Sequence, residues 1–188
     1  MCIPALNSYD PNDKLVGIRS MQRDGNFTDR NDELVYTVRF QNTGNAPARN
    51  IYILDSISYK LDLRSFKYLN SSHFSSLSMD ENRMLRIDFK NINLPDSASN
   101  PEGSQGFVSY SIKPLLNLDT GELIENVANI YFDFNPPITT NTTKNRFVKK
   151  SVKDLNWSGN ISYNEIGKLT VYPNPTKDSL YFNDFEKK

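Results

Sequence analysis

The residues best suited to chemistry form a run of oxygen-bearing side chains near the start of the chain, Asp10-Pro11-Asn12-Asp13. Calcium takes six to eight oxygen ligands, and closely spaced Asp and Asn side chains supply several of them. Two interpretations remain open for Asp10, Asn12 and Asp13: a calcium site, or an Asx-turn that caps the first strand. The Asx-turn is favoured because the spacing is not that of an EF-hand loop. The residues expected to complete a calcium shell, if the first and last strands are neighbours, are Asp133 and Asn135.

No catalytic constellation is predicted. Nucleophilic catalysis needs a base beside the nucleophile, usually His, and the only His is His73, after Ser71-Ser72 in an expected loop. One His and the single Cys, Cys2, are too few for the three or four protein ligands of zinc. Carboxylates are plentiful, but no pattern brings two of them together across a cleft, as glycoside hydrolysis requires. The sequence therefore predicts a protein that is not an enzyme and has no cofactor, with calcium as the open option.

The charge balance and hydropathy restrict the partners and the location. With 22 basic and 22 acidic residues the formal net charge is zero, which argues against nucleic acid or an anionic membrane as partner. No stretch approaches the roughly 20 apolar residues of a membrane span. Residues 1–7 lack the charged start and longer apolar region of a signal peptide. If the protein is secreted, we therefore expect this chain to be a fragment.

The strongest pattern along the chain is the alternation from residue 34 to residue 41. Period two with β-branched and aromatic residues is typical of a half-buried strand. Its predicted inward face consists of Leu34, Tyr36, Val38 and Phe40. The run Asn42-Thr43-Gly44-Asn45 predicts a turn, because Gly and Asn tolerate positive φ. A second strand is expected from Asn50, with Ile51 and Ile53 on one side and Tyr52 and Leu54 on the other.

Further strands are predicted at residues 14–20, 84–92, 106–115 and 123–134. Residues 59–68 lack a clean period and are expected to form a loop, with at most a short strand near Phe66. Six or seven strands at this spacing, with no convincing helix, predict an all-β fold, an Ig-like antiparallel two-sheet sandwich. The first strand carries Leu15, Val16 and Ile18, and the predicted inward residues of the later strands are Leu85, Ile87, Phe89, Val108, Tyr110, Ile112, Ala128, Ile130, Phe132 and Phe134.

Four tyrosines lie out of phase with these inward sets: Tyr52, Tyr59, Tyr68 and Tyr131. Aromatic faces pack on the apolar patches of ligands, so a sugar-binding platform is one interpretation. The other is that these rings cover the second sheet or the ends of the domain.

Several motifs around the central strand resemble a known family. The segments Tyr36-Thr37-Val38 and Gln41–Ala48 resemble the conserved-repeat, immunoglobulin-like modules of bacterial surface proteins. Ser8–Lys14 and Asn126–Asn141 are similar to the version found near the C-termini of large Bacteroidota secreted proteins. The resemblance spans roughly residues 8–145 and implies a fold and an extracellular location, but no reaction. In such proteins Asp55-Ser56-Ile57 also resembles a short acceptor pattern for O-glycans.

The end of the chain has a different character. Residues 149–167 are polar and are expected to form a linker, and residues 168–182 closely resemble the opening strand and turn of the C-terminal sorting domain of type IX secretion. The residues that carry the sorting motif are Tyr172, Pro173, Asn174 and Pro175. That family continues for several more strands, so the sorting domain is expected to be incomplete, with one strand at Leu169–Tyr172. Removal of all residues after Asn145 is expected to change the stability of the sandwich by less than about 0.5 kcal/mol.

The sequence thus predicts a frayed N-terminus at 1–8, an Ig-like β-sandwich at 9–147, a polar linker at 148–167 and an incomplete C-terminal sorting domain, a partial β tail, at 168–188. We expect a non-catalytic module, secreted or at the cell surface, that spaces or presents upstream domains and leads into a type IX secretion sorting signal. Its expected partner is the secretion machinery, through the tail if that is complete. The alternative is an adhesion module that binds a glycan or protein, with calcium as a stabilising ligand.

Overall fold

The computed structural model describes residues 11–18, 27–149, 160–163 and 169–172. The chain divides into two compact units, residues 1–151 and 152–188. The strands of the first unit are β1 (Asp13–Ile18), β2 (Phe27–Thr28), β3 (Leu34–Gln41), β4 (Ile51–Ser56), β5 (Leu61–Ser71), β6 (Ser76–Met79), β7 (Met84–Phe89), β8 (Gln105–Pro114), β9 (Leu123–Asn126), β10 (Ala128–Phe132), β11 (Ile138–Thr139) and β12 (Thr143–Phe147). The described residues form no helix, and so none long and apolar enough to cross a membrane.

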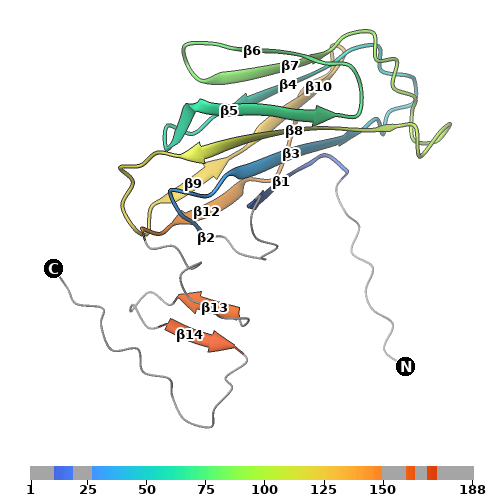
Figure 1. Cartoon of the computed structure of the whole chain (residues 1–188). Coiled ribbons are helices and arrows are strands. Elements are labelled where there is room, and N and C mark those ends of the chain that lie inside the picture. The colour runs from blue at the N-terminus through green and yellow to red at the C-terminus, as the bar shows by residue number, and fades with distance from the viewer. Residues whose placement is uncertain (1–10, 19–26, 150–159, 164–168, 173–188) are drawn as a thin grey trace, which may run out of the picture. The chain divides into compact units, whose positions relative to one another are not determined.

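Two main sheets face each other in the first unit, as the sequence predicts for a sandwich (Figure 1). One sheet has the order β1-β3-β8-β5 and the other the order β11-β10-β4-β7-β6. A small third sheet, β2-β12-β9, adjoins them at one end, where β2 and β12 form a parallel pair. The fold is therefore an Ig-like all-β sandwich in which residues far apart in sequence meet between the layers.

The alternation of β3 sets the register of its sheet. β3 pairs antiparallel with β1 on one side and β8 on the other, so that Tyr36 lies opposite both Val16 and Tyr110. Burial alternates along its whole length, with the predicted apolar set inward. β4 buries Ile51 and Ile53, also as predicted. The remaining core prediction is confirmed for Leu85, Ile87, Phe89, Val108, Tyr110, Ile112, Ala128, Ile130 and Phe132, all of which are buried.

The inward face of β1 holds a charged residue. Of the apolar residues that the first strand carries, Leu15 is 41 % exposed, whereas its neighbour Lys14 is fully buried. Period two allows only one of these neighbours to face the core. The polar group is the one inside because the interior holds partners for it.

Two predictions from the sequence were wrong. Residues 59–68 lie largely in the long strand β5, whose pairing with β8 is interrupted by register shifts after Asp62 and after Tyr68. Such irregularities disturb the period-two pattern from which strands are recognised. Phe134 is fully exposed, because β10 ends at Phe132 and the next residue, Asp133, has a positive φ of 51°.

The chain enters and leaves the sandwich at opposite ends. β1 begins with Asp13 opposite Arg39, at the end where β3 finishes and β8 starts. β12 finishes at Phe147, which exchanges backbone hydrogen bonds with the loop beyond the far end of β8, namely Gly121 and Glu122. Figure 1 shows β12 at the end of the sandwich where β9 and β2 also lie.

The second unit contains an antiparallel strand pair, β13 (Asn160–Tyr163) and β14 (Leu169–Tyr172). β14 has the bounds predicted for the strand of the tail. β13 lies inside the stretch expected to be a linker. Of the sorting motif, the structure describes Tyr172 at the end of β14, whereas Pro173, Asn174 and Pro175 lie outside the described residues, as does the predicted frayed segment 1–8.

The burial of Phe147 contradicts the expectation that removal of all residues after Asn145 is neutral. Phe147 is 1 % exposed and belongs to the core, so ending the chain after Asn145 cannot be neutral. We expect a chain ending at Asn145 to lose about 3–5 kcal/mol, as for deletion of a buried Phe. A chain ending at Lys149 should differ from the full chain by less than about 0.5 kcal/mol. Urea unfolding of the two truncations measures both values, and equal midpoints would contradict the boundary.

Candidate functional site

Four side chains meet between the sheets in a site that we call the buried polar cluster, defined as Lys14, Asp55, Tyr110 and Asn126. Each comes from a different strand: β1, β4, β8 and β9 respectively. Their exposed fractions are between 0 % and 2 %. Charged residues are rarely fully buried unless paired, so this group is the most unusual chemistry in the described part of the chain.

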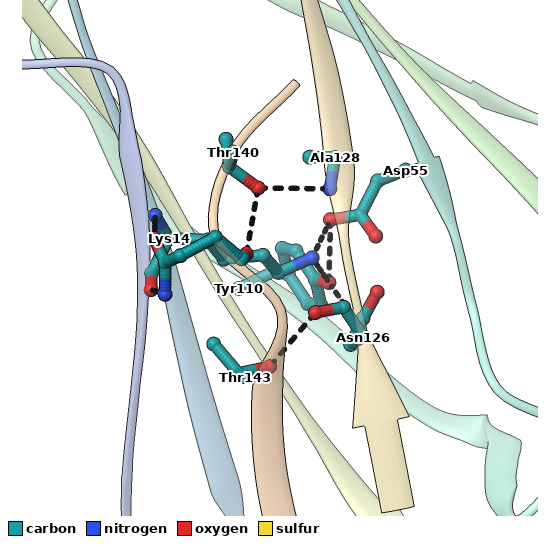
Figure 2. Close-up of polar contacts among 8 residues, drawn as sticks. Lys14, Asp55, Tyr110, Asn126, Ala128, Thr140 and Thr143 are labelled. Carbon is teal, nitrogen blue, oxygen red and sulfur yellow. Dashed lines mark hydrogen bonds and ion pairs between the residues drawn. The ribbon is translucent and has the colours of Figure 1, made fainter. Parts of the chain in front are cut away.

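The Asp55 carboxylate connects the cluster, as Figure 2 shows. Its Oδ2 accepts a short hydrogen bond from the Lys14 ammonium and another, 2.7 Å long, from the Tyr110 hydroxyl. Lys14 Nζ also donates to the Tyr110 oxygen at 3.2 Å, and Asn126 Nδ2 donates to the same oxygen at 3.1 Å. The amine and the carboxamide therefore both lie within hydrogen-bond distance of one hydroxyl.

Two aromatic rings surround the Lys14 amine. Nζ lies 5.1 Å from the ring centroid of Tyr36 and 5.6 Å from that of Tyr110, and the two rings stack on each other. Aromatic faces attract cations, yet they supply far less solvation than water. Burial consequently lowers the pKa of Lys14, with Asp55 opposing the shift. Burial and the nearby Asp55 charge raise the pKa of Tyr110 well above its ordinary value, which keeps the hydroxyl protonated.

The cluster also contains polar atoms without hydrogen-bond partners in the described part of the chain. Asp55 Oδ1 and Asn126 Oδ1 are both buried and unbonded. An unsatisfied buried oxygen costs about 1–3 kcal/mol, and more if it is charged, so such atoms are rare and frequently functional. Both oxygens belong to residues that bond to the Tyr110 hydroxyl.

A second layer of contacts fixes the strands that carry Lys14 and Asn126 (Figure 2). The Asn141 side chain bonds to both the main-chain N–H and C=O of Lys14, each at 2.9 Å. Thr143 Oγ1 donates to the main-chain oxygen of Asn126 at 3.1 Å. Thr140 Oγ1 accepts from the Ala128 N–H at 3.1 Å. The segment before and at the start of β12 thus holds β1 and the β9–β10 junction in place.

The buried polar cluster was not predicted from the sequence. Asp55 was noted in a glycan-acceptor pattern, and no inward position was predicted for Lys14. A signal was nevertheless present, because Lys14 is in phase with Val16 and out of phase with the more exposed Leu15. Asp55 likewise shares the phase of the buried Ile51 and Ile53. When two strands each carry a charged residue at a position that alternation assigns to the core, and the charges are opposite, an internal ion pair is indicated.

The calcium candidates are engaged in other contacts where the structure describes them. Both Asp13 carboxylate oxygens accept hydrogen bonds from the Arg39 guanidinium at 2.7 Å, and Asn12 Oδ1 accepts from the Gln41 N–H. Asp133 accepts from the N–H groups of Arg49 and Asn50. Asp10 lies outside the described residues. Among the residues described, no three acidic, His or Cys side chains are grouped to hold a metal.

These contacts lead to a prediction about calcium. We expect saturating calcium or a chelator to leave the melting temperature unchanged, because the Arg39 guanidinium already neutralises Asp13. Differential scanning calorimetry measures this, with the calcium-free protein as reference. A bound site would add about 2.7 kcal/mol at a hundredfold excess over the dissociation constant. A rise in melting temperature that Asp13→Ala abolishes would establish the site instead.

The single His contacts its neighbour without forming a catalytic arrangement. His73 Nδ1 lies 2.8 Å from Ser72 Oγ. That hydroxyl also bonds to both the N–H and the C=O of Phe107, where β5 meets β8. The Ser72 hydroxyl therefore extends the pairing between β5 and β8 beyond the last residue of β5.

The fold and the site together define an immunoglobulin-like β-sandwich domain whose core contains the buried polar cluster. Residues 10–146 match the family described as Domain of unknown function (DUF7619), and the chain belongs to this family. No curated protein matches the sequence.

Solved structures similar to this chain include domains of bacterial surface proteins. Domains D2 and D3 of the major pilin SpaD from Corynebacterium diphtheriae share 14 % identity, with 71 % of this chain and 51 % of that chain covered and a TM-score of 0.47. The collagen-binding domain of a Staphylococcus aureus adhesin shares 11 %, with 75 % and 99 % covered and a TM-score of 0.43. The C-terminal domain of the Streptococcus agalactiae AgI/II polypeptide BspA shares 18 %, with 75 % and 51 % covered and a TM-score of 0.48. The chain spans about half the length of the pilin and BspA chains.

Proposed function

We propose that this domain is an in-line structural module of an exported protein, secreted or held at the cell surface. It spaces or presents the domains that precede it and leads into a type IX sorting signal. The observation that carries the proposal is the entry of the chain at Asp13 and its exit at Phe147, at opposite ends of the sandwich. A domain connected in this way separates whatever is attached before and after it.

The length of the strands sets the separation. β8 has 10 residues, and an antiparallel strand rises about 3.4 Å per residue, so it measures about 34 Å. The apolar core between two sheets keeps this length constant, because close-packed interiors are poorly compressible. Each copy of the domain is therefore a rigid spacer of about this size.

A fusion protein tests the spacing. With one fluorescent protein before Met1 and another after Lys149, insertion of a second copy of residues 9–149 should increase the maximum dimension in small-angle scattering by about 34 Å or more. The matched control inserts a flexible Gly/Ser linker of equal residue number, whose average end-to-end distance of about 60–70 Å exceeds the length of the folded domain and is broadly distributed. A second copy that leaves the maximum dimension unchanged would exclude the in-line arrangement.

The sorting part of the proposal rests on the resemblance of residues 168–182 to the first strand and turn of the type IX sorting domain. β14 ends at Tyr172, where that motif continues into Pro173-Asn174-Pro175. Export of a reporter fused to residues 155–188, in a Bacteroidota host with this pathway, tests it. We expect no export from this fusion alone, since residues 155–188 resemble only the first strand and turn of the sorting domain, and export once the later strands are supplied. Failure of the completed fusion would refute the type IX assignment.

A second function is favoured by an aromatic pair on the outer face of the sheet β11-β10-β4-β7-β6. Tyr52 and Tyr131 stack with ring centroids 4.3 Å apart and planes 8° from parallel, and the Arg86 guanidinium lies 4.2 Å from the Tyr52 centroid. Both rings are partly exposed. Stacked tyrosines beside a cation suit a glycan, which would make the domain an adhesion module.

A glycan array probed with the wild-type domain and with Tyr131→Ala tests whether the two tyrosines bind a glycan or only cover the sheet. Binding that is lost in Tyr131→Ala but retained in Tyr59→Ala, a change at a ring that is 75 % exposed outside the pair, would support the adhesion module. Equal signals from all three proteins would leave the pair as a cover of the sheet.

A further inference from the structure

The buried polar cluster brings an amine, a carboxylate and a carboxamide together in a place without access to water. Lys14, Asp55 and Asn126 have exposed fractions of 0 %, 0 % and 2 %. An amine and a carboxamide are the reactants of transamidation, and a carboxylate is the group that can move the protons. We propose that Lys14 and Asn126 become joined by an intramolecular amide bond, with Asp55 as the general acid and base.

Lys14 is suited to act as the nucleophile. An amine attacks a carbonyl carbon only in its neutral form, and desolvation in an apolar pocket is one of the ways in which proteins obtain a neutral Lys. The Tyr36 and Tyr110 rings enclose Nζ, and burial lowers the Lys14 pKa. The hydrogen bond from Nζ to Asp55 Oδ2 gives the proton a direct path to the carboxylate.

Asn126 is suited to act as the electrophile. Its Nδ2 donates to the Tyr110 hydroxyl, which fixes the plane of the carboxamide, and its Oδ1 has no hydrogen-bond partner in the described part of the chain. The second oxygen of Asp55, Oδ1, is also free of partners there. Once Asp55 has taken the Lys14 proton, it becomes a carboxylic acid, which can donate to the carboxamide oxygen and polarise the carbonyl for attack.

The reaction balances without any other reactant. Lys14 Nζ first transfers one proton to Asp55, and the neutral amine attacks Asn126 Cγ to give a tetrahedral intermediate. A second proton passes from Nζ through Asp55 to Nδ2, the Cγ–Nδ2 bond breaks, and ammonia leaves. The product is an amide N–H between Nζ and Cγ, with the remaining proton on Asp55. Charge is conserved, because the ion pair becomes a neutral amide, a neutral acid and ammonia.

The fold supplies the positioning that this step requires. Well-oriented groups in one molecule reach effective concentrations that no intermolecular reaction attains. Asn141 holds the backbone of Lys14, and Thr143 holds that of Asn126. Tyr110 bonds to all three reacting side chains, and its raised pKa keeps its hydroxyl available as a donor to Asp55. Tyr110 is thus a positioning residue.

Mass spectrometry of the purified full chain tests the proposal. Under denaturing conditions the intact mass should be lower than the sequence mass by one molecule of ammonia, and a protease digest should contain a branched peptide linking Lys14 to Asn126. Loss of ammonia without this branched peptide would indicate a succinimide at an Asn and would refute the proposal. A folded protein that keeps its full mass after prolonged incubation would refute it as well.

Three variants assign the roles through the same readout, applied to protein whose circular dichroism shows that it is folded. Lys14→Met and Asp55→Ala should both retain the full mass, the first for lack of a nucleophile and the second for lack of a proton carrier. Asn126→Asp should still form the branched peptide, now with loss of water. Asn145→Ala, at a buried Asn outside the cluster, is the matched control and should lose ammonia as the wild type does. A branched peptide at Asn126 in Lys14→Met, or at Lys14 in the folded Asp55→Ala variant, would overturn the assignment.

Discussion

Replacement of Asp55 by Ala is expected to lower the free energy of unfolding by at least about 3 kcal/mol, the cost of breaking a buried ion pair by removing one partner. The variant leaves the Lys14 ammonium without a counter-charge in a site with 0 % exposure. It also removes the acceptor of the Tyr110 hydroxyl. Urea unfolding followed by tyrosine fluorescence measures the loss as a shift of the midpoint. A loss below about 1 kcal/mol would show that the pair contributes little.

A double variant separates charge pairing from other roles of the site. Buried ion pairs are often replaced by apolar residues without loss of stability, so Lys14→Met with Asp55→Leu should recover most of what Asp55→Ala loses if charge balance is the whole contribution. If Lys14 and Asn126 are linked, the double variant also loses that link. A link across more than 100 residues contributes about 4–5 kcal/mol in the chain-entropy model, so recovery should then fail.

The second large effect is expected at Phe40, the residue around which the apolar core is packed. Phe40 is 1 % exposed, and its ring contacts those of Phe89 and Phe132, with centroids 5.1 and 6.4 Å away. Phe40→Ala should cost about 3–5 kcal/mol, a large part of the roughly 5–15 kcal/mol that holds a domain together. Thermal unfolding by circular dichroism measures the loss. Phe74→Ala, at a ring that is 91 % exposed, is the matched control and should have little effect.

Gly106 provides an independent check on the same contact. A Cβ at this position would lie 2.3 Å from the Phe40 ring, whereas one at Gly17 would have nothing within 4 Å. Gly106→Ala should therefore destabilise by about 1–3 kcal/mol through overpacking, and Gly17→Ala should be neutral or slightly stabilising. The opposite order of the two melting temperatures would place the Phe40 ring elsewhere.

The fold could be predicted where each strand is buried on one face only and keeps an uninterrupted period. β3 and β7 meet this condition, and their buried residues were identified from alternation alone. β5 was missed because it pairs with β8 on one side only and its register shifts break the pattern. Phe134 was misplaced because the positive φ of Asp133 ends β10, and the sequence does not show that bend.

The buried polar cluster could not be predicted in the same way. Lys14 and Asp55 are 41 positions apart, and each alone is typical of a solvated surface. Their burial is favourable only because the two sheets bring them together with Tyr110 and Asn126. The alternation of each strand indicates that Lys14 and Asp55 occupy inward positions. That they are each other's partner across the core follows only from the fold.

The opposite ends at which the chain enters and leaves the sandwich determine how it would respond to mechanical tension. A pull on the N-terminal side acts along β1 from its first residue, Asp13. The six residue pairs between β1 and β3, from Asp13↔Arg39 to Ile18↔Leu34, would then be sheared together rather than opened one at a time. A covalent link from Lys14 to Asn126 would carry that load straight from β1 to β9, so that the core between them would remain folded while only the last strands extend.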